Sequence, residues 1–132
     1  MDPISKDQIR ALIEEHGAPS ISIYLPTHRM LQKQQDQIRF KNLLRDAQGE
    51  LVKLGFRSPE ARGLLEPAKQ ILDDPFFWEH LADGLAVFIS RQTFRRFRLA
   101  YRLEALAVVA ERFHLKPLLP AISQEGRFYI LA

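Results

Sequence analysis

The stretch from Gln32 to Leu54 constrains the fold more than any other part of the chain. Its apolar residues recur at the 3.6-residue spacing of a single helix face: Phe40, Leu43, Leu44, Ala47, Leu51 and Leu54. Gly55 ends this pattern, and Ser58-Pro59-Glu60 predicts a second helix with its N-cap at Ser58 and proline in its first turn. The two helices are expected to form a long antiparallel hairpin with its tip at residues 55–58.

Pro67 interrupts the pattern of the second helix, whose apolar face extends from Ala61 to Leu72. Proline has no backbone N–H, and its ring crowds the carbonyl four residues earlier, here that of Gly63. We therefore expect a kink or a break near Glu66.

The N-terminal residues predict a short capped helix. Ser5 and Gln8 have the spacing of a capping box, and Ile4 and Ile9 have that of a hydrophobic staple. Gly17 is expected to provide the C-cap.

Short strand patterns occupy the rest of the chain. Residues 20–25 alternate polar and apolar side chains, which predicts a strand with one apolar face that ends at Pro26. Residues 85–89 predict a buried strand, and residues 94–103 its hairpin partner. Residues 106–110 fit a helix or a strand, and we favour a strand. Together the patterns predict an α+β fold: a small, mainly antiparallel sheet of about four strands, packed on a layer of helices that includes the hairpin.

Composition excludes several classes of protein. The absence of cysteine rules out disulfide scaffolds and cysteine nucleophiles, and it fits a cytoplasmic protein. The sequence has neither a run of about 20 apolar residues nor a signal-peptide core, so we expect no membrane association. The net charge of +3 is mild and does not by itself indicate nucleic-acid binding.

The distribution of arginine is more informative than the net charge. Arg91, Arg95, Arg96, Arg98 and Arg102 lie within twelve residues. If residues 94–103 form one strand, Arg96, Arg98 and Arg102 share a face with neighbours about 7 Å apart, which is comparable with the phosphate spacing of extended RNA. The planar guanidinium binds phosphate through two hydrogen bonds. Two alternatives remain: a solvated outer face that deters edge-to-edge pairing, and a surface for an acidic protein.

Other polar groups give weaker signals for chemistry. The four histidines (His16, His28, His80 and His114) lack the spacing of a helical metal pair, so we expect no metal site and no cofactor. The carboxylates around Phe76-Phe77-Trp78 suit acid–base catalysis, but Asp74 is better explained as a helix cap and Asp83 as a turn former. The aromatic residues themselves are expected to fill the core rather than to stack on bases. A small enzyme built around His28 or these carboxylates is the least supported hypothesis, so we expect no catalytic activity.

Several segments resemble the N-terminal domain of the bacterial homologues of archaeo-eukaryotic peptide-chain release factors. The resemblance rests on residues 22–29 with Asp36, Ile38-Arg39 and residues 41–44, and on residues 83–88, 113–120 and 126–129. It implies an α+β domain followed by further domains. The superfamily's peptide-releasing Gly-Gly-Gln loop does not occur in this chain. Of the stop-codon motif Asn-Ile-Lys-Ser, only the serine has a counterpart at the predicted hairpin tip.

The resemblance implies a non-catalytic domain that binds the ribosome or RNA in translation-related rescue or regulation. Arg95, Arg96, Arg98 and Arg102 are the main candidates for phosphate contacts, and Arg29, Arg39 and Arg57 are weaker candidates. The alternative is a protein-interaction module without a nucleic-acid role, which forms a homodimer through the strand pattern at Phe128–Leu131.

The C-terminal residues suggest a domain boundary. Residues 113–120 are a proline-bounded apolar connector, and residues 126–132 have the composition of a strand. We expect residues 1–120 to form the release-factor-like domain. Residues 121–132 are expected to be a connector and the truncated first strand of a following domain. The alternative is a terminal strand that pairs back into the sheet.

Overall fold

The computed structural model describes residues 4–15, 17–28, 33–79, 81 and 83–120. The predicted α+β class is confirmed, and the sheet is antiparallel throughout with the strand order β3-β2-β1-β4. The elements, in chain order, are α1 (Lys6–Glu14), β1 (Ser20–Pro26), α2 (Lys33–Lys53), α3 (Ser58–Leu72), α4 (Pro75–Glu79), β2 (Gly84–Ile89), β3 (Phe94–Leu99), β4 (Leu106–Ala110) and the 3₁₀ turn η1 (Lys116–Leu118).

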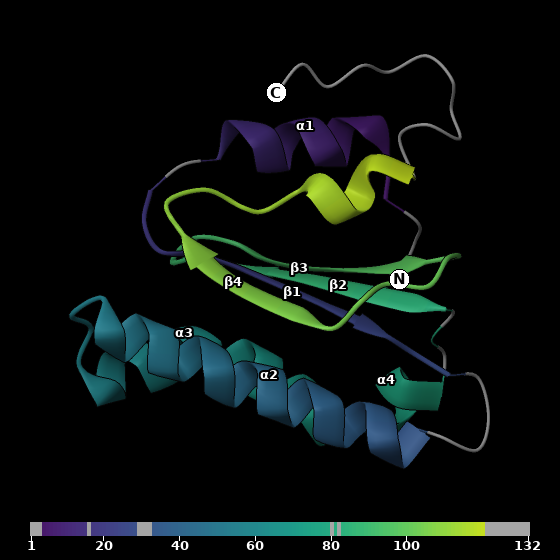
Figure 1. Ribbon diagram of the computed structural model, residues 1–132, viewed down its shortest axis with the longest axis horizontal. Helices are drawn as coiled ribbons and strands as arrows, with labels where there is room; N and C mark the ends of the chain where they lie inside the picture. The colour runs from purple at the N-terminus through teal and green to yellow at the C-terminus, as the bar shows by residue number, and fades with distance from the viewer. Residues whose placement is uncertain (1–3, 16, 29–32, 80, 82, 121–132) are drawn as a thin grey trace.

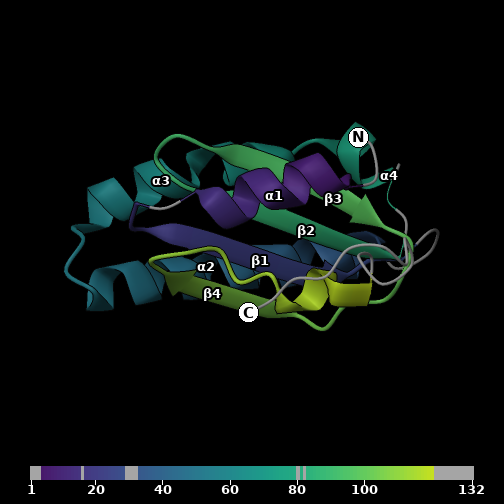
Figure 2. The ribbon, with the colours of Figure 1, turned by 90° about the horizontal axis from the view of Figure 1, so that it is seen from above.

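Helical elements cover both faces of the sheet. The helices α2, α3 and α4 lie against one face, and α1 and η1 lie against the other (Figures 1 and 2). The helices α2 and α3 are connected by residues 54–57 and pack against each other. The sequence predicted a single layer of helices, and the layer formed by α1 and η1 was not predicted.

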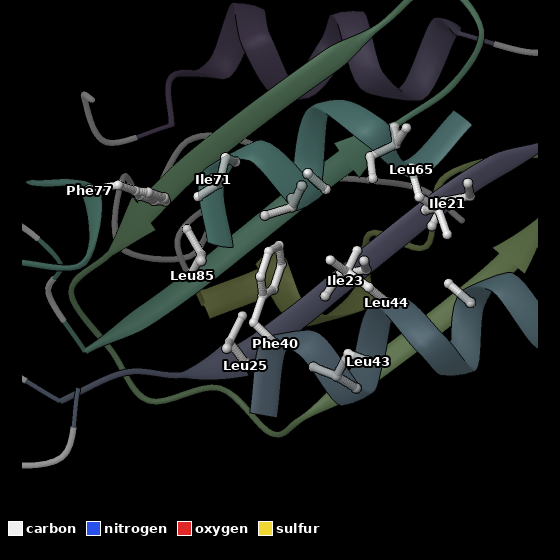
Figure 3. Packing of buried hydrophobic residues seen from close by; sticks show 14 of the residues in the cluster. Ile21, Ile23, Leu25, Phe40, Leu43, Leu44, Leu65, Ile71, Phe77 and Leu85 are labelled. Atoms are coloured by element: carbon white, nitrogen blue, oxygen red, sulfur yellow. The ribbon is translucent and has the colours of Figure 1, made fainter. Parts of the chain in front are cut away.

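The second layer corrects the prediction that β1 has one apolar face, because every residue of β1 is buried. Ile21, Ile23 and Leu25 pack toward α2 and α3 (Figure 3). The polar residues that alternate with them are buried beneath the other layer, where the chain from 111 to 114 satisfies them. The Ser20 hydroxyl donates to the Glu111 carbonyl at 3.2 Å, and the Ser22 hydroxyl accepts from the His114 N–H at 2.9 Å.

Tyr24 joins β1 to the same returning segment. Its ring lies edge-on to Phe88 with 5.8 Å between centroids, and its hydroxyl donates to the His114 carbonyl. Burial, and secondarily the charge of Tyr101, raises the pKa of Tyr24 above the usual range of tyrosine. The phenol therefore stays a neutral donor in the folded protein.

The start of α1 follows its sequence signals. The Ser5 hydroxyl accepts from the Gln8 N–H at 3.2 Å, and the Gln8 side chain accepts from the Ser5 N–H at 2.8 Å, which confirms the capping box. The helix ends at Glu14 with Glu15 as its C-cap, two residues before the predicted position. Gly17 has φ of +127°, a conformation that favours glycine, in the bend that leads to β1.

The predicted cap of α3 is wrong by one residue. Arg57 occupies the N-cap position without a side-chain bond, and Ser58 and Pro59 are already helical. The expected break near Glu66 is absent, and the helix continues through Pro67 to Leu72. Leu65, Ala68 and Ile71 are buried on both sides of this proline, and their packing holds the helix together.

The strand β3 ends at Leu99, four residues before the predicted end. Leu99 pairs with Gly84, and the Leu99 carbonyl accepts from the Asp83 N–H at 3.2 Å. The chain then crosses over Gly84 so closely that a Cβ there would lie 2.6 Å from the Tyr101 carbonyl oxygen. This crossing leaves the plane of the sheet, and the chain returns as β4 on the far side of β1, which confirms the strand at 106–110.

Leucine-to-alanine substitutions at positions 51 and 54 test the packing of the core on the α2 side. Leu51 is fully buried against the sheet, whereas Leu54 is 62% exposed. We expect Leu51→Ala to lower the free energy of unfolding by about 2–5 kcal/mol, because it leaves a cavity. Leu54→Ala should change it by about 0.5 kcal/mol or less. Urea unfolding measures both, and equal losses would contradict the packing described here.

Tyr24→Phe tests the buried phenol. The loss of the donor to the His114 carbonyl should lower the free energy of unfolding by about 1 kcal/mol at neutral pH. The folded-state pKa is raised, so the stabilising effect of the phenol is complete below pH of about 10, where tyrosine in the unfolded chain ionises. It is lost as the pH rises further. Between neutral and alkaline pH, the free energy of unfolding should therefore fall less steeply for Tyr24→Phe than for the unmodified chain. An equal pH dependence of the two proteins would refute this role.

Candidate nucleic-acid interface

The predicted arginine row is only partly formed on β3. Arg96 and Arg98 point to the same side of the strand as Phe94, which packs toward the α2–α3 core. Arg95 lies on the opposite side. Arg102 lies beyond the end of β3 and does not continue the row, because the chain turns over Gly84. The short strand thus separates Arg102 from Arg96 and Arg98, the three arginines that the sequence placed on one face.

Arg96 packs on the aromatic residues of α4. Its guanidinium lies 5.2 Å from the ring centroid of Phe77, and Phe77 stacks on Trp78 with 5.3 Å between centroids. Phe77 and Trp78 are buried, as predicted for core aromatics, whereas Phe76 is 69% exposed. The Asp74 carboxylate accepts from the N–H groups of Phe76 and Phe77 at 3.1 and 3.4 Å, which confirms its role as a cap.

The exposed arginines differ in their surroundings. Arg91 pairs with Glu60 at 3.3 Å and lies over the Phe56 ring, so the β2–β3 turn contacts the region where α3 begins. Within the described part of the chain, no carboxylate lies within 4 Å of the guanidinium groups of Arg95, Arg96 or Arg102. Arg57 is exposed where α3 begins. Arg29 lies outside the described residues.

A buried carboxylate organises the end of β1. Asp36, which is 1% exposed, accepts from the His28 N–H and contacts His28 Nδ1, both at 2.7 Å. Arg39 approaches the same carboxylate at 3.5 Å, so this candidate for a phosphate contact is engaged within the fold. Asp36 lies in the first turn of α2, where a negative charge interacts favourably with the helix dipole. This geometry ties the residues after β1 to α2 and orients a partly exposed imidazole.

The structure brings together a second basic group that the sequence analysis did not single out. A groove of about 370 Å³ runs between α2 and α3, and residues of both helices line it: Lys41, Asn42, Leu44, Arg45, Gln48, Lys69, Leu72 and Asp73. Lys69 Nζ donates to the Gln48 side chain at 3.5 Å across the groove. The sequence contained one signal for this group: Lys41 and Arg45 are four residues apart and off the apolar stripe, so they lie on the same exposed face of one helix. Nothing in the sequence pattern placed Lys69 beside them.

The groove continues toward the start of α2. An adjoining hollow shares Lys41, Leu72 and Asp73 with it and adds Gln34, Gln37 and Ile38. Among the described residues that line the two hollows, Asp73 is the only carboxylate. The surface thus combines three cations with amide side chains that donate hydrogen bonds, which suits an anionic ligand more than a cationic one.

Comparisons with known proteins do not add to this description. No protein-family model matches the chain, and no curated protein matches its sequence. Within the described ranges, no helix is both long enough and apolar enough to cross a membrane, and no three His, Asp or Glu side chains gather as metal ligands would.

Asp36→Ala tests the buried carboxylate. The substitution leaves the His28 N–H without its acceptor and removes a charge-assisted contact, so we expect the free energy of unfolding to fall by about 1–3 kcal/mol. Asp46→Ala is the matched control, because Asp46 is exposed on the same helix and should change it by about 0.5 kcal/mol or less. Urea unfolding of the two variants decides between a structural clamp and an incidental contact.

Proposed function

We propose that this chain is a non-catalytic recognition domain of a release-factor-like protein that binds RNA, with the ribosome as its site of action. The groove between α2 and α3 carries the proposal, because Lys41, Arg45 and Lys69 converge there from two helices with one carboxylate among the lining residues. Phosphate groups are the ligands that such a group of cations favours.

The shape of this surface favours a chain of phosphates over a single small anion. The groove of about 370 Å³ and the adjoining hollow of about 410 Å³ follow the same helix pair, so together they form an elongated depression. Asn42, Gln34, Gln37 and Gln48 add amide groups along it, and amides bind the 2′-hydroxyl and the base edges of RNA.

The arginines of β3 extend the positive surface to the edge of the sheet. Arg95 and Arg96 are exposed and have no described carboxylate within 4 Å, so no adjacent described ion pair neutralises their charge. Their positive field speeds the encounter with RNA, whereas the groove holds the phosphates. The resemblance of residues 22–29 and Asp36 to release-factor-like proteins supports the ribosome as the source of that RNA. Of these residues, His28 and Asp36 form the contact at the start of α2.

Substitutions in the groove test the RNA proposal. We expect the chain to co-sediment with ribosomes and to bind fluorescein-labelled polyuridine at low salt, with affinity falling as salt rises. The double variant K41Q/K69Q should weaken binding and reduce the slope of log K against log[salt] by about 2, one for each lost phosphate contact. Fluorescence anisotropy at several salt concentrations measures this slope.

Lys53→Gln provides the matched control. Lys53 lies on the same helix and pairs with Glu50 at 3.4 Å, outside the groove between α2 and α3. This variant should keep the slope of the unmodified chain. The absence of binding to both ribosomes and polyuridine at low salt would refute the proposed function. An equal effect of Lys53→Gln and K41Q/K69Q would refute the groove as the binding site.

A further inference from the structure

The strand β4 presents an unusual edge. It pairs with β1 on one side, and no strand within the described residues pairs with its other side. Its five residues, Leu106–Ala110, are all apolar and all at least partly exposed. The opposite edge of the sheet, β3, carries three arginines, which is a common protection against edge-to-edge pairing. The edge of β4 lacks this protection.

We propose that two copies of this chain associate through β4, which pairs antiparallel with β4 of the second copy about a two-fold axis at Val108. An isologous contact of this kind closes on itself and gives a dimer rather than a fibre. Main-chain hydrogen bonds supply the affinity, as in other cases of strand addition. The proposal does not depend on RNA binding.

The charges that flank β4 determine the register. Pairing about Val108 places Leu106 opposite Ala110 of the partner. Glu104 lies two residues before β4, and Arg112 lies two residues after it in a bend, so this pairing brings Glu104 to the end of the interface where the partner's Arg112 lies. The two-fold axis repeats each approach. Opposite charges on neighbouring antiparallel segments attract each other, and long side chains reach one another even where the two residues are not directly opposite. Glu104 and Arg112 are both exposed, and neither forms an ion pair with another described residue. The apolar strand thus has complementary charges at its two ends for a second copy of itself.

The helix layer leaves room for this arrangement. The helix α2 contacts both β1 and β4, so it lies beneath these two strands. If α2 lies midway between β1 and β4, it is half a strand spacing from β4. The α2 helices of the two copies are then about two strand spacings, or about 9–10 Å, apart, which is a normal packing distance for helices. A hollow of about 680 Å³ lies between α2 and β4, lined on the helix by Leu43, Arg45, Asp46, Gly49, Glu50 and Lys53. A Cβ at Gly49 would meet no described atom within 4 Å, so the helices have space to approach.

The dimer has a defined arrangement. Its sheet contains four strands from each copy, with the arginine-bearing β3 strands at the two outer edges. The axis is perpendicular to the sheet, so both α2–α3 grooves face the same side. This interface differs from the predicted pairing through Phe128–Leu131, which lies outside the described residues.

Charge reversal tests the register. We expect sedimentation velocity over a range of concentrations to show a monomer–dimer equilibrium for the unmodified chain. Glu104→Arg places a like charge near Arg112 of the partner at both ends of the interface, and Arg112→Glu does the same near the partner's Glu104. Each single variant should raise the dimer dissociation constant by about tenfold or more. The double variant E104R/R112E restores both pairs and should return the constant to within about threefold of the original.

The controls separate this interface from others. Circular dichroism should show the same helix and strand content in all variants, since both sites are exposed. Ile130→Pro disrupts strand pairing by residues 128–131 and should leave the dimer unchanged. A chain that stays monomeric at the highest concentration overturns the proposal. A dimer that is insensitive to Glu104→Arg, or one that is lost in Ile130→Pro, also overturns it.

Discussion

The burial of β1 on both faces is the constraint on which the rest of the structure depends. Its isoleucines and Leu25 pack on α2 and α3, and its serines and Tyr24 face the layer that contains α1. Buried hydroxyl groups need partners, and the chain from 111 to 114 provides them. One strand therefore fixes the positions of both neighbouring strands, both helical layers and the segment that leads to η1.

Two covered faces leave the edges of the sheet and the outer surfaces of the helices for contacts with other molecules. The cationic groove lies between α2 and α3, and the apolar edge lies at β4. These surfaces differ in chemistry, so they suit different partners: the groove suits phosphates, and the edge suits a second strand. Because α2 contributes to the groove on one side and packs beside β4 on the other, a dimer through β4 would hold two grooves on one face of the assembly.

The agreement between sequence and structure is best where the signal is local. The Ser5–Gln8 box and the Asp74 cap each depend on atoms within three residues, so composition and spacing are sufficient to predict them. The errors lie where a distant segment intervenes. The crossing of the chain over Gly84 ends β3 at Leu99 and separates Arg102 from Arg96 and Arg98, and no pattern within residues 94–103 reveals that crossing.

The candidate surfaces show the same division. By itself the sequence determined the α+β class, the approximate extents of the helices and strands, and the burial of Phe77 and Trp78, because periodicity and turn residues act over short distances. Only the tertiary structure decided that β1 is covered twice, that Lys69 lies beside Lys41 and Arg45, and that Asp36 holds His28. These are contacts between segments far apart in the chain or set by a loop between elements, and they follow from how the layers pack rather than from the order of the residues.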